Sequence, residues 1–225
     1  MKLRFRRCLG AATLACLIAV VGCGKTPPIS FSTTVASPPP ESIKLKKVKK
    51  SYELVTRAWT RHGLVTADYQ QIIEVYATLR SPEWATASLR REFAFASPSL
   101  DTRDAKVAAM QKRSEEFVEF SILVSTWDRA ENILHRMEKS PWTVSMVGDN
   151  GEIVAPIAIE RDKRPDYVIR AEFPAHGDFS TAYKVRFPNQ GLLAPERAAL
   201  TLRVYGVRGA IEMTWRNGET VSKYY

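Results

Sequence analysis

The sequence predicts an α+β protein in which a helical segment precedes an antiparallel β-sandwich. Through most of residues 51–115, apolar residues recur at helical spacing. From Phe117 onward they alternate with polar residues, which is typical of strands that bury one face. Turn signals separate these short runs, and no helix of crossover length lies between them, so we expect antiparallel pairing of seven to eight strands.

The first 22 residues have the layout of a secretory signal peptide. A basic n-region containing Lys2 and three arginines precedes the uncharged apolar run 8–21. This run has 14 residues, whereas a helix needs about 20 to cross the hydrocarbon core of a bilayer. We therefore expect cleavage of residues 1–22 rather than a retained transmembrane helix.

The end of the apolar run reads Val20-Val21-Gly22-Cys23 and resembles the lipobox of bacterial lipoproteins. The resemblance covers residues 1–24 only. It implies a diacylglycerol on Cys23, cleavage before it and acylation of the new amino terminus. At the family's sorting position the chain has Gly24, which implies attachment to the outer membrane on its periplasmic side.

The three cysteines are Cys8, Cys16 and Cys23, and cleavage would leave only Cys23. The mature chain would then contain no disulfide, so its stability must come from core burial. The formal charge of +9 would fall to +5, a mild excess that suits an anionic lipid or glycan surface and solubility equally well.

Residues 23–45 are rich in proline, serine and threonine, which predicts an extended tether between the lipid and the folded part. Five lysines follow within residues 44–50. They suit contact with anionic headgroups, or else the solvated start of a helix.

We expect residues 46–116 to be helical, because apolar stripes and helix start signals recur along them. The expected helices are one ended by Gly63, one capped by Thr66 with a stripe through Leu79, one begun by Ser81-Pro82-Glu83, and one capped by Asp101 or Thr102 through about Glu116.

Residues 117–225 are expected to form the β-sandwich, for which an immunoglobulin-like arrangement without the cysteine pair is the best architectural hypothesis. Asp149-Asn150-Gly151 and Asn217-Gly218 predict hairpin turns, the second of which would return a last strand to Tyr225. The expected strands lie within 117–126, 142–146, 153–159, 167–173, 183–187, 200–205 and 211–216.

No motif for catalysis or metal binding occurs, and we expect no cofactor. His62, His135 and His176 lie far apart in sequence, without a second ligand at metal spacing. The outward positions of the expected strands collect basic residues, which predicts a basic binding surface if these strands are neighbours. The alternative is an ordinary charged exterior. The five residues are Arg170, Lys184, Arg186, Arg203 and Arg216.

The sequence favours a non-catalytic envelope lipoprotein that acts as a binding or assembly module. Its expected partners are the membrane, through the lipid, and an envelope protein or an anionic glycan or lipid. The expected compartment excludes nucleic acid. Two alternatives remain open: a hydrolase or glycan-processing enzyme whose site is built from distant residues, and a carrier with an apolar pocket.

Overall fold

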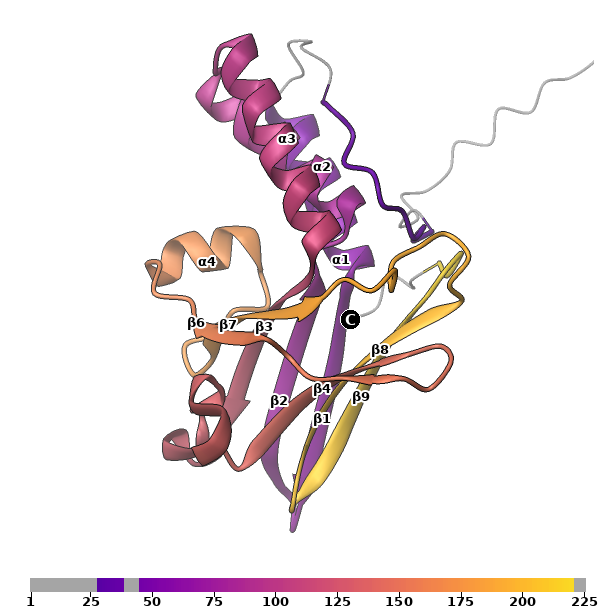
Figure 1. Ribbon diagram of the computed structural model, residues 1–225. Helices are drawn as coiled ribbons and strands as arrows, with labels where there is room; N and C mark the ends of the chain where they lie inside the picture. Colours follow the sequence, from indigo (N-terminus) through magenta and orange to yellow (C-terminus); the bar gives the residue numbers. More distant parts are fainter. Residues whose placement is uncertain (1–27, 39–44, 221–225) are drawn as a thin grey trace, which may run out of the picture.

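Two antiparallel sheets form the body of the protein in the computed structural model, which describes residues 28–38 and 45–220 (Figure 1). The larger sheet has the order β1-β2-β3-β7-β6 and the smaller sheet the order β5-β4-β8-β9. The strands are β1 (Thr60–Ala67), β2 (Gln70–Leu79), β3 (Phe117–Thr126), β4 (Trp142–Gly148), β5 (Ile153–Val154), β6 (Ala158–Arg161), β7 (Thr181–Pro188), β8 (Ala199–Gly206) and β9 (Gly209–Arg216).

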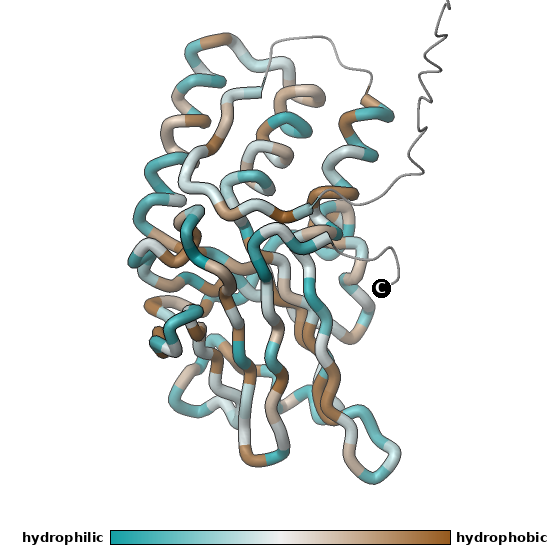
Figure 2. The backbone as a smooth tube through the Cα atoms, turned by 90° about the vertical axis from the view of Figure 1, so that its right-hand side faces the viewer, coloured by the Kyte–Doolittle hydropathy of each residue, from teal (hydrophilic) through white to brown (hydrophobic). Residues whose placement is uncertain are grey.

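Three helices project from one end of the sheets, as Figures 1 and 2 both show, and a fourth lies apart from them beside β6. The four are α1 (Leu45–Ala58), α2 (Pro82–Ala96), α3 (Leu100–Glu116) and α4 (Asp166–Glu172). Two short 3₁₀ turns, η1 (Arg129–Glu131) and η2 (Leu134–Lys139), connect β3 to β4. The broad class, helices combined with antiparallel sheet, is the one that the sequence predicted.

The main core lies between the inner faces of the two sheets. Alternate residues of each strand point to this side, and the ring of Phe120 on β3 meets those of Phe187 and Trp215 at 5.8 and 5.3 Å. All three side chains are almost completely buried. β1 and β9 pack closely against each other, and a Cβ atom at Gly63 would overlap the side chain of Ile211.

Trp59, at the junction of α1 and β1, joins both sheets to the helices. Its carbonyl oxygen accepts hydrogen bonds from the backbone N–H of Leu79 at 3.0 Å and from Nε1 of Trp215 at 2.9 Å. Its own Nε1 donates to Glu83 at the start of α2, also at 2.9 Å. One fully buried residue therefore contacts β2, β9 and α2.

The expected tether over residues 23–45 is wrong for residues 28–36, which pack against the folded body. Ile29 exchanges backbone hydrogen bonds with the segment after β9, and its side chain is completely buried. Phe31 stacks on Trp59 with ring centroids 6.2 Å apart, and Val35 joins a small cluster with α2. Because the surrounding segment is rich in proline, serine and threonine, the sequence did not indicate that these three apolar residues are buried.

The expected helices between residues 60 and 79 are also wrong, because this stretch forms the hairpin β1–β2. The burial of both Ile72 and Ile73 explains the error: they lie on opposite faces of β2, so the apolar pattern does not alternate. Since β2 pairs with β3, the larger sheet crosses the boundary that we expected at residue 116. The helical and β parts therefore share one core.

Several elements are confirmed. The side chain of Ser81 caps α2 by accepting from the N–H of Trp84, and β3 begins at Phe117. The cap of α3 is Ser99 rather than Asp101 or Thr102. The lysines of residues 45–50 lie in the first turns of α1, in agreement with a helix start.

Two expected strands differ in the structure. Residues 166–172 form α4, which follows Pro165 and buries Ile169 against the body, so the alternation from Tyr167 to Phe173 does not mark a strand. The run 153–159 is divided between β5 and β6, which belong to different sheets. The signal peptide, Cys23 and the expected last strand to Tyr225 lie outside the described residues. Within the described part of the chain, no helix is long and apolar enough to cross a membrane.

We predict that Phe31→Ala destabilises the protein by about 3 kcal/mol, because it removes a buried aromatic ring and leaves a cavity beside Trp59. Urea-induced unfolding followed by tryptophan fluorescence measures the effect. The matched control is Thr33→Ala, an exposed position for which we expect a change within about 0.5 kcal/mol. Equal stability of the two variants would show that residues 28–36 do not contribute to the core.

The turn between β1 and β2 gives a second prediction. Asp68 and Tyr69 have φ values of 50° and 63°, a left-handed conformation that costs a non-glycine residue about 1–2 kcal/mol. Tyr69→Gly should therefore be more stable than Tyr69→Ala by about 1 kcal/mol in thermal unfolding, although glycine is more flexible in the unfolded chain. Greater stability of the alanine variant would contradict this account of the turn.

Candidate functional site

The five basic residues predicted to form one surface lie on four separate elements. Lys184 and Arg186 are on β7 of the larger sheet, whereas Arg203 and Arg216 are on β8 and β9 of the smaller sheet. Arg170 lies on α4 rather than on a strand. A single basic stripe over one sheet is therefore not formed.

Four of the five also have acidic partners. Ion pairs with acidic side chains neutralise much of the positive charge of these residues, as expected for the exterior of strands. The pairs are Arg170–Asp178 at 2.7 Å, Lys184–Asp162 at 3.6 Å, Arg186–Glu119 at 3.0 Å and Arg203–Glu212 at 3.2 Å.

Asp162 is the centre of a partly buried ion-pair network under α4. Its side chain is 5% exposed and accepts hydrogen bonds from Arg164, whose guanidinium also contacts Glu172 at 2.9 Å. Burial by itself would raise the pKa of Asp162. The hydrogen bonds from Arg164 and the charge of Lys184 outweigh that effect, and the pKa lies below the ordinary aspartate value. This network ties α4 to the larger sheet.

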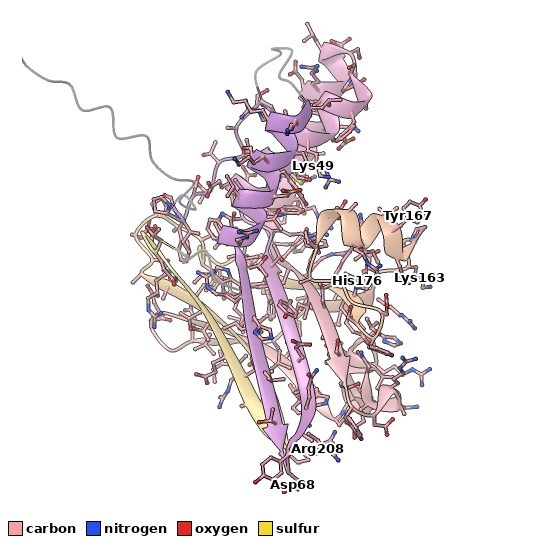
Figure 3. All side chains as sticks on the ribbon, turned by 180° about the vertical axis from the view of Figure 1, so that it is seen from behind. Lys49, Asp68, Lys163, Tyr167, His176 and Arg208 are labelled. Carbon is pink, nitrogen blue, oxygen red and sulfur yellow. The ribbon has the colours of Figure 1, made fainter. Side chains whose placement is uncertain are left out.

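Beside this network, a wide cleft of about 890 Å³ opens next to β6, β7 and η2. Four basic and two acidic residues contribute to its lining, so the wall carries an excess of positive charge. The lining residues are His135, Ile159, Glu160, Arg161, Asp162, Lys163, Arg164 and Lys184. Figure 3 shows Lys163 at the edge of the molecule, next to α4.

Strand register separates the charges at the cleft. Arg161 pairs with Tyr183, and Glu160 pairs with Lys184, so consecutive residues of β6 point to opposite faces of the sheet. Glu160 forms its ion pair with Arg186 on the face opposite to Arg161. The neighbouring Asp162 is satisfied by Arg164 and Lys184, as described above. Arg161 and Lys163 are exposed, and no acidic partner is found for either among residues 28–38 and 45–220.

The pKa of His135 is influenced by the positive charges near the cleft. Its ring stacks on that of Tyr183, with centroids 6.1 Å apart and planes 24° apart. Burial and the nearby charges of Arg136, Arg161 and Lys163 lower the pKa of His135 below its usual value, so the ring is neutral at pH 7. Its Nδ1 atom has no hydrogen-bond partner among the described residues. The cleft thus places the two unpaired cations Arg161 and Lys163 near a neutral imidazole.

This arrangement can bind an anion. A guanidinium presents paired donors that match carboxylate or phosphate oxygens, and an ammonium adds a compact charge. Over the described residues, no group of three or more histidine, cysteine, aspartate or glutamate side chains could hold a metal ion.

The other two histidines are engaged elsewhere. His62 lies 3.0 Å from Glu74 and stacks on Tyr76 in a second groove, of about 530 Å³, over β1 and β2. His176 is buried, and its Nδ1 lies 2.7 Å from the hydroxyl of Ser180. The three histidines, which are far apart in sequence, therefore also lie in three different parts of the structure.

No protein-family model matches the chain, and no curated protein matches it.

Sequence reasoning missed the residues of the cleft. The sequence analysis assigned no function to the connection between two expected strands, which reads Arg161-Asp162-Lys163-Arg164-Pro165. The signal was present in the alternation of the first three charges, because alternate residues of an extended segment point to opposite sides. His135 carried no local signal, because its approach to Tyr183 depends on the tertiary fold.

We predict that Asp162→Asn destabilises the protein at pH 7 by about 2 kcal/mol, since Arg164 and Lys184 lose their shared carboxylate while Arg164 keeps Glu172. The pKa of Asp162 is depressed in the folded state, so its stabilising effect is present above the unfolded pKa of about 3.9 and is lost as the pH falls through the folded value. Urea unfolding at several pH values should therefore show the difference shrinking below about pH 4.

The control for this prediction is Asp178→Asn, which removes an exposed surface pair with Arg170 and should cost less than about 1 kcal/mol. A difference between wild type and Asp162→Asn that stays constant from pH 7 to pH 3 would contradict the assignment.

Proposed function

We propose that this protein is a non-catalytic lipoprotein of the bacterial outer membrane whose folded part faces the periplasm and binds an anionic envelope partner. The observation that carries the proposal is the cleft beside β6, where Arg161 and Lys163 remain without acidic partners around His135. An uncompensated set of cations in a cleft favours an anionic ligand. Within this proposal, the two sheets are a variant of the immunoglobulin-like sandwich.

The signal-like residues 1–22 and the lipobox-like residues 20–23 support attachment through Cys23. Two or more acyl chains hold a protein stably at a membrane, whereas one chain gives only marginal binding. The docking of residues 28–36 changes the expected geometry. Only residues 23–27 would separate the lipid from the folded body, and they can span at most about 18 Å. The proposed anchor would hold the body close to the bilayer.

We predict that Cys23→Ser abolishes incorporation of labelled palmitate and releases the full-length protein from the membrane fraction, because the proposed site of acylation is lost. Expression in a bacterium with the lipoprotein maturation pathway, followed by fractionation with a high-salt wash, measures both effects. Cys8→Ser and Cys16→Ser are matched controls, since both residues belong to the segment expected to be removed. Palmitate labelling that persists in Cys23→Ser would overturn the anchor.

A further inference from the structure

We infer that the cleft beside β6 binds a doubly charged tetrahedral oxyanion, specifically a phosphate monoester group, through Arg161 and Lys163, and that His135 takes up a proton from solvent when the anion binds. The inference rests on the proposed function, because it names the chemistry of the ligand and the control of binding at that same cleft. A phosphate monoester can be a lipid headgroup or belong to a free phosphorylated molecule.

The balance of charges favours a dianion. The two acids that line the cleft, Glu160 and Asp162, are paired with Arg186, Arg164 and Lys184. Arg161 and Lys163 are left to face a ligand, and the charge of Arg136 on η2 also reaches His135. A carboxylate would neutralise one of these cations, whereas a phosphate monoester carries −1.5 to −2 charges at pH 7 and three strong acceptor oxygens.

The position of His135 couples binding of the anion to protonation of its imidazole ring. Tyr183 on β7 stacks on its ring. The charges that act on His135 belong to Arg136 on η2, Arg161 on β6 and Lys163 after β6. Burial raises the pKa of Tyr183, so this hydroxyl stays neutral and does not offset the three cations. Burial and these three cations together keep His135 neutral in the free protein, and a bound dianion would offset the repulsion from the cations and favour the imidazolium. Protonation would place a positive charge beside the anion and make both ring nitrogens donors. Nδ1 is itself buried and has no hydrogen-bond partner among the described residues.

Titration calorimetry of the full-length protein in neutral detergent with inorganic phosphate tests the site. Arg161→Ala and Lys163→Ala should each weaken binding about tenfold, as expected for the loss of one charged hydrogen bond. Arg216→Ala is the control, because it removes one exposed arginine from the other sheet and should leave the affinity unchanged. Equal loss in all three variants would mean that only net charge matters and would overturn the site, as would undetectable binding to the wild type.

A second measurement tests whether His135 takes up a proton when the anion binds. Sulfate stays doubly charged between about pH 5 and 8, the interval in which histidine titrates. Its affinity should rise as the pH falls, and the imidazole NMR signal of His135 should titrate at higher pH when sulfate is present. His135→Phe keeps a ring to stack on Tyr183 but cannot bind a proton, so it should remove the pH dependence of sulfate binding while the protein remains folded. A pH dependence that survives in His135→Phe would overturn the role of His135.

The two sources of phosphate are distinguished by comparing a water-soluble short-chain phosphatidic acid with inorganic phosphate. Tighter binding of the lipid would assign the site to a headgroup, and equal or weaker binding would assign it to a free phosphorylated molecule. The test is independent of the anchor. A wild-type protein that incorporates no palmitate but still binds phosphate would refute the proposed attachment alone, whereas a lipidated protein that binds neither probe would refute the inference alone.

Discussion

The burial of Trp59 between the sheets and the helices is the constraint on which the rest of the structure depends. Its carbonyl joins β2 to the indole of Trp215 on β9, and its indole joins α1 to Glu83 of α2. Phe31 stacks on the Trp59 ring. A tryptophan indole N–H and a backbone carbonyl need partners when they are buried, so these elements are fixed relative to one another by a few atoms. This explains why a Pro/Ser-rich segment, a helical layer and two sheets share one core.

The sequence predicted those elements whose local pattern agrees with their final surroundings. β3 has an alternating pattern, and α2 has both a serine cap and a proline at its start, so local chemistry was sufficient. β2 was missed because Ile72 and Ile73 are both buried, one on each face, and their spacing with Tyr76 also fits a helix. The turn before it contains Asp68 and Tyr69 at positive φ without the usual glycine, so no hairpin signal marked it. Tertiary packing, rather than local preference, decided this region.

The candidate site was less accessible to sequence reasoning than the fold, because a binding surface depends on which charges remain unpaired. The sequence assigns Arg186 and Arg203 to a basic surface, but in the fold they form ion pairs with Glu119 and Glu212. Arg161 lay in a run of mixed charge that suggested no binding at all. Only the register of β6 against β7 shows that Glu160 turns to one face and Arg161 to the other. Counting basic residues therefore selected positions of which four have acidic partners in the fold, whereas Arg161 and Lys163 have none among the described residues.

The position of the cleft bears on the origin of its ligand. Residues 28–38 and the cleft elements β6 and η2 lie on opposite sides of the molecule, with β8 and β9 near the former (Figure 1). Figure 3 agrees, since Lys163 lies at the edge away from that segment. If Cys23 carries lipid, at most about 18 Å of chain would separate it from residue 28, so the side with residues 28–38 would lie nearer the bilayer than β6 and η2. The proposed anchor would then place the cleft residues of β6 away from the headgroups of the same bilayer, which favours a phosphate group from solution over a headgroup.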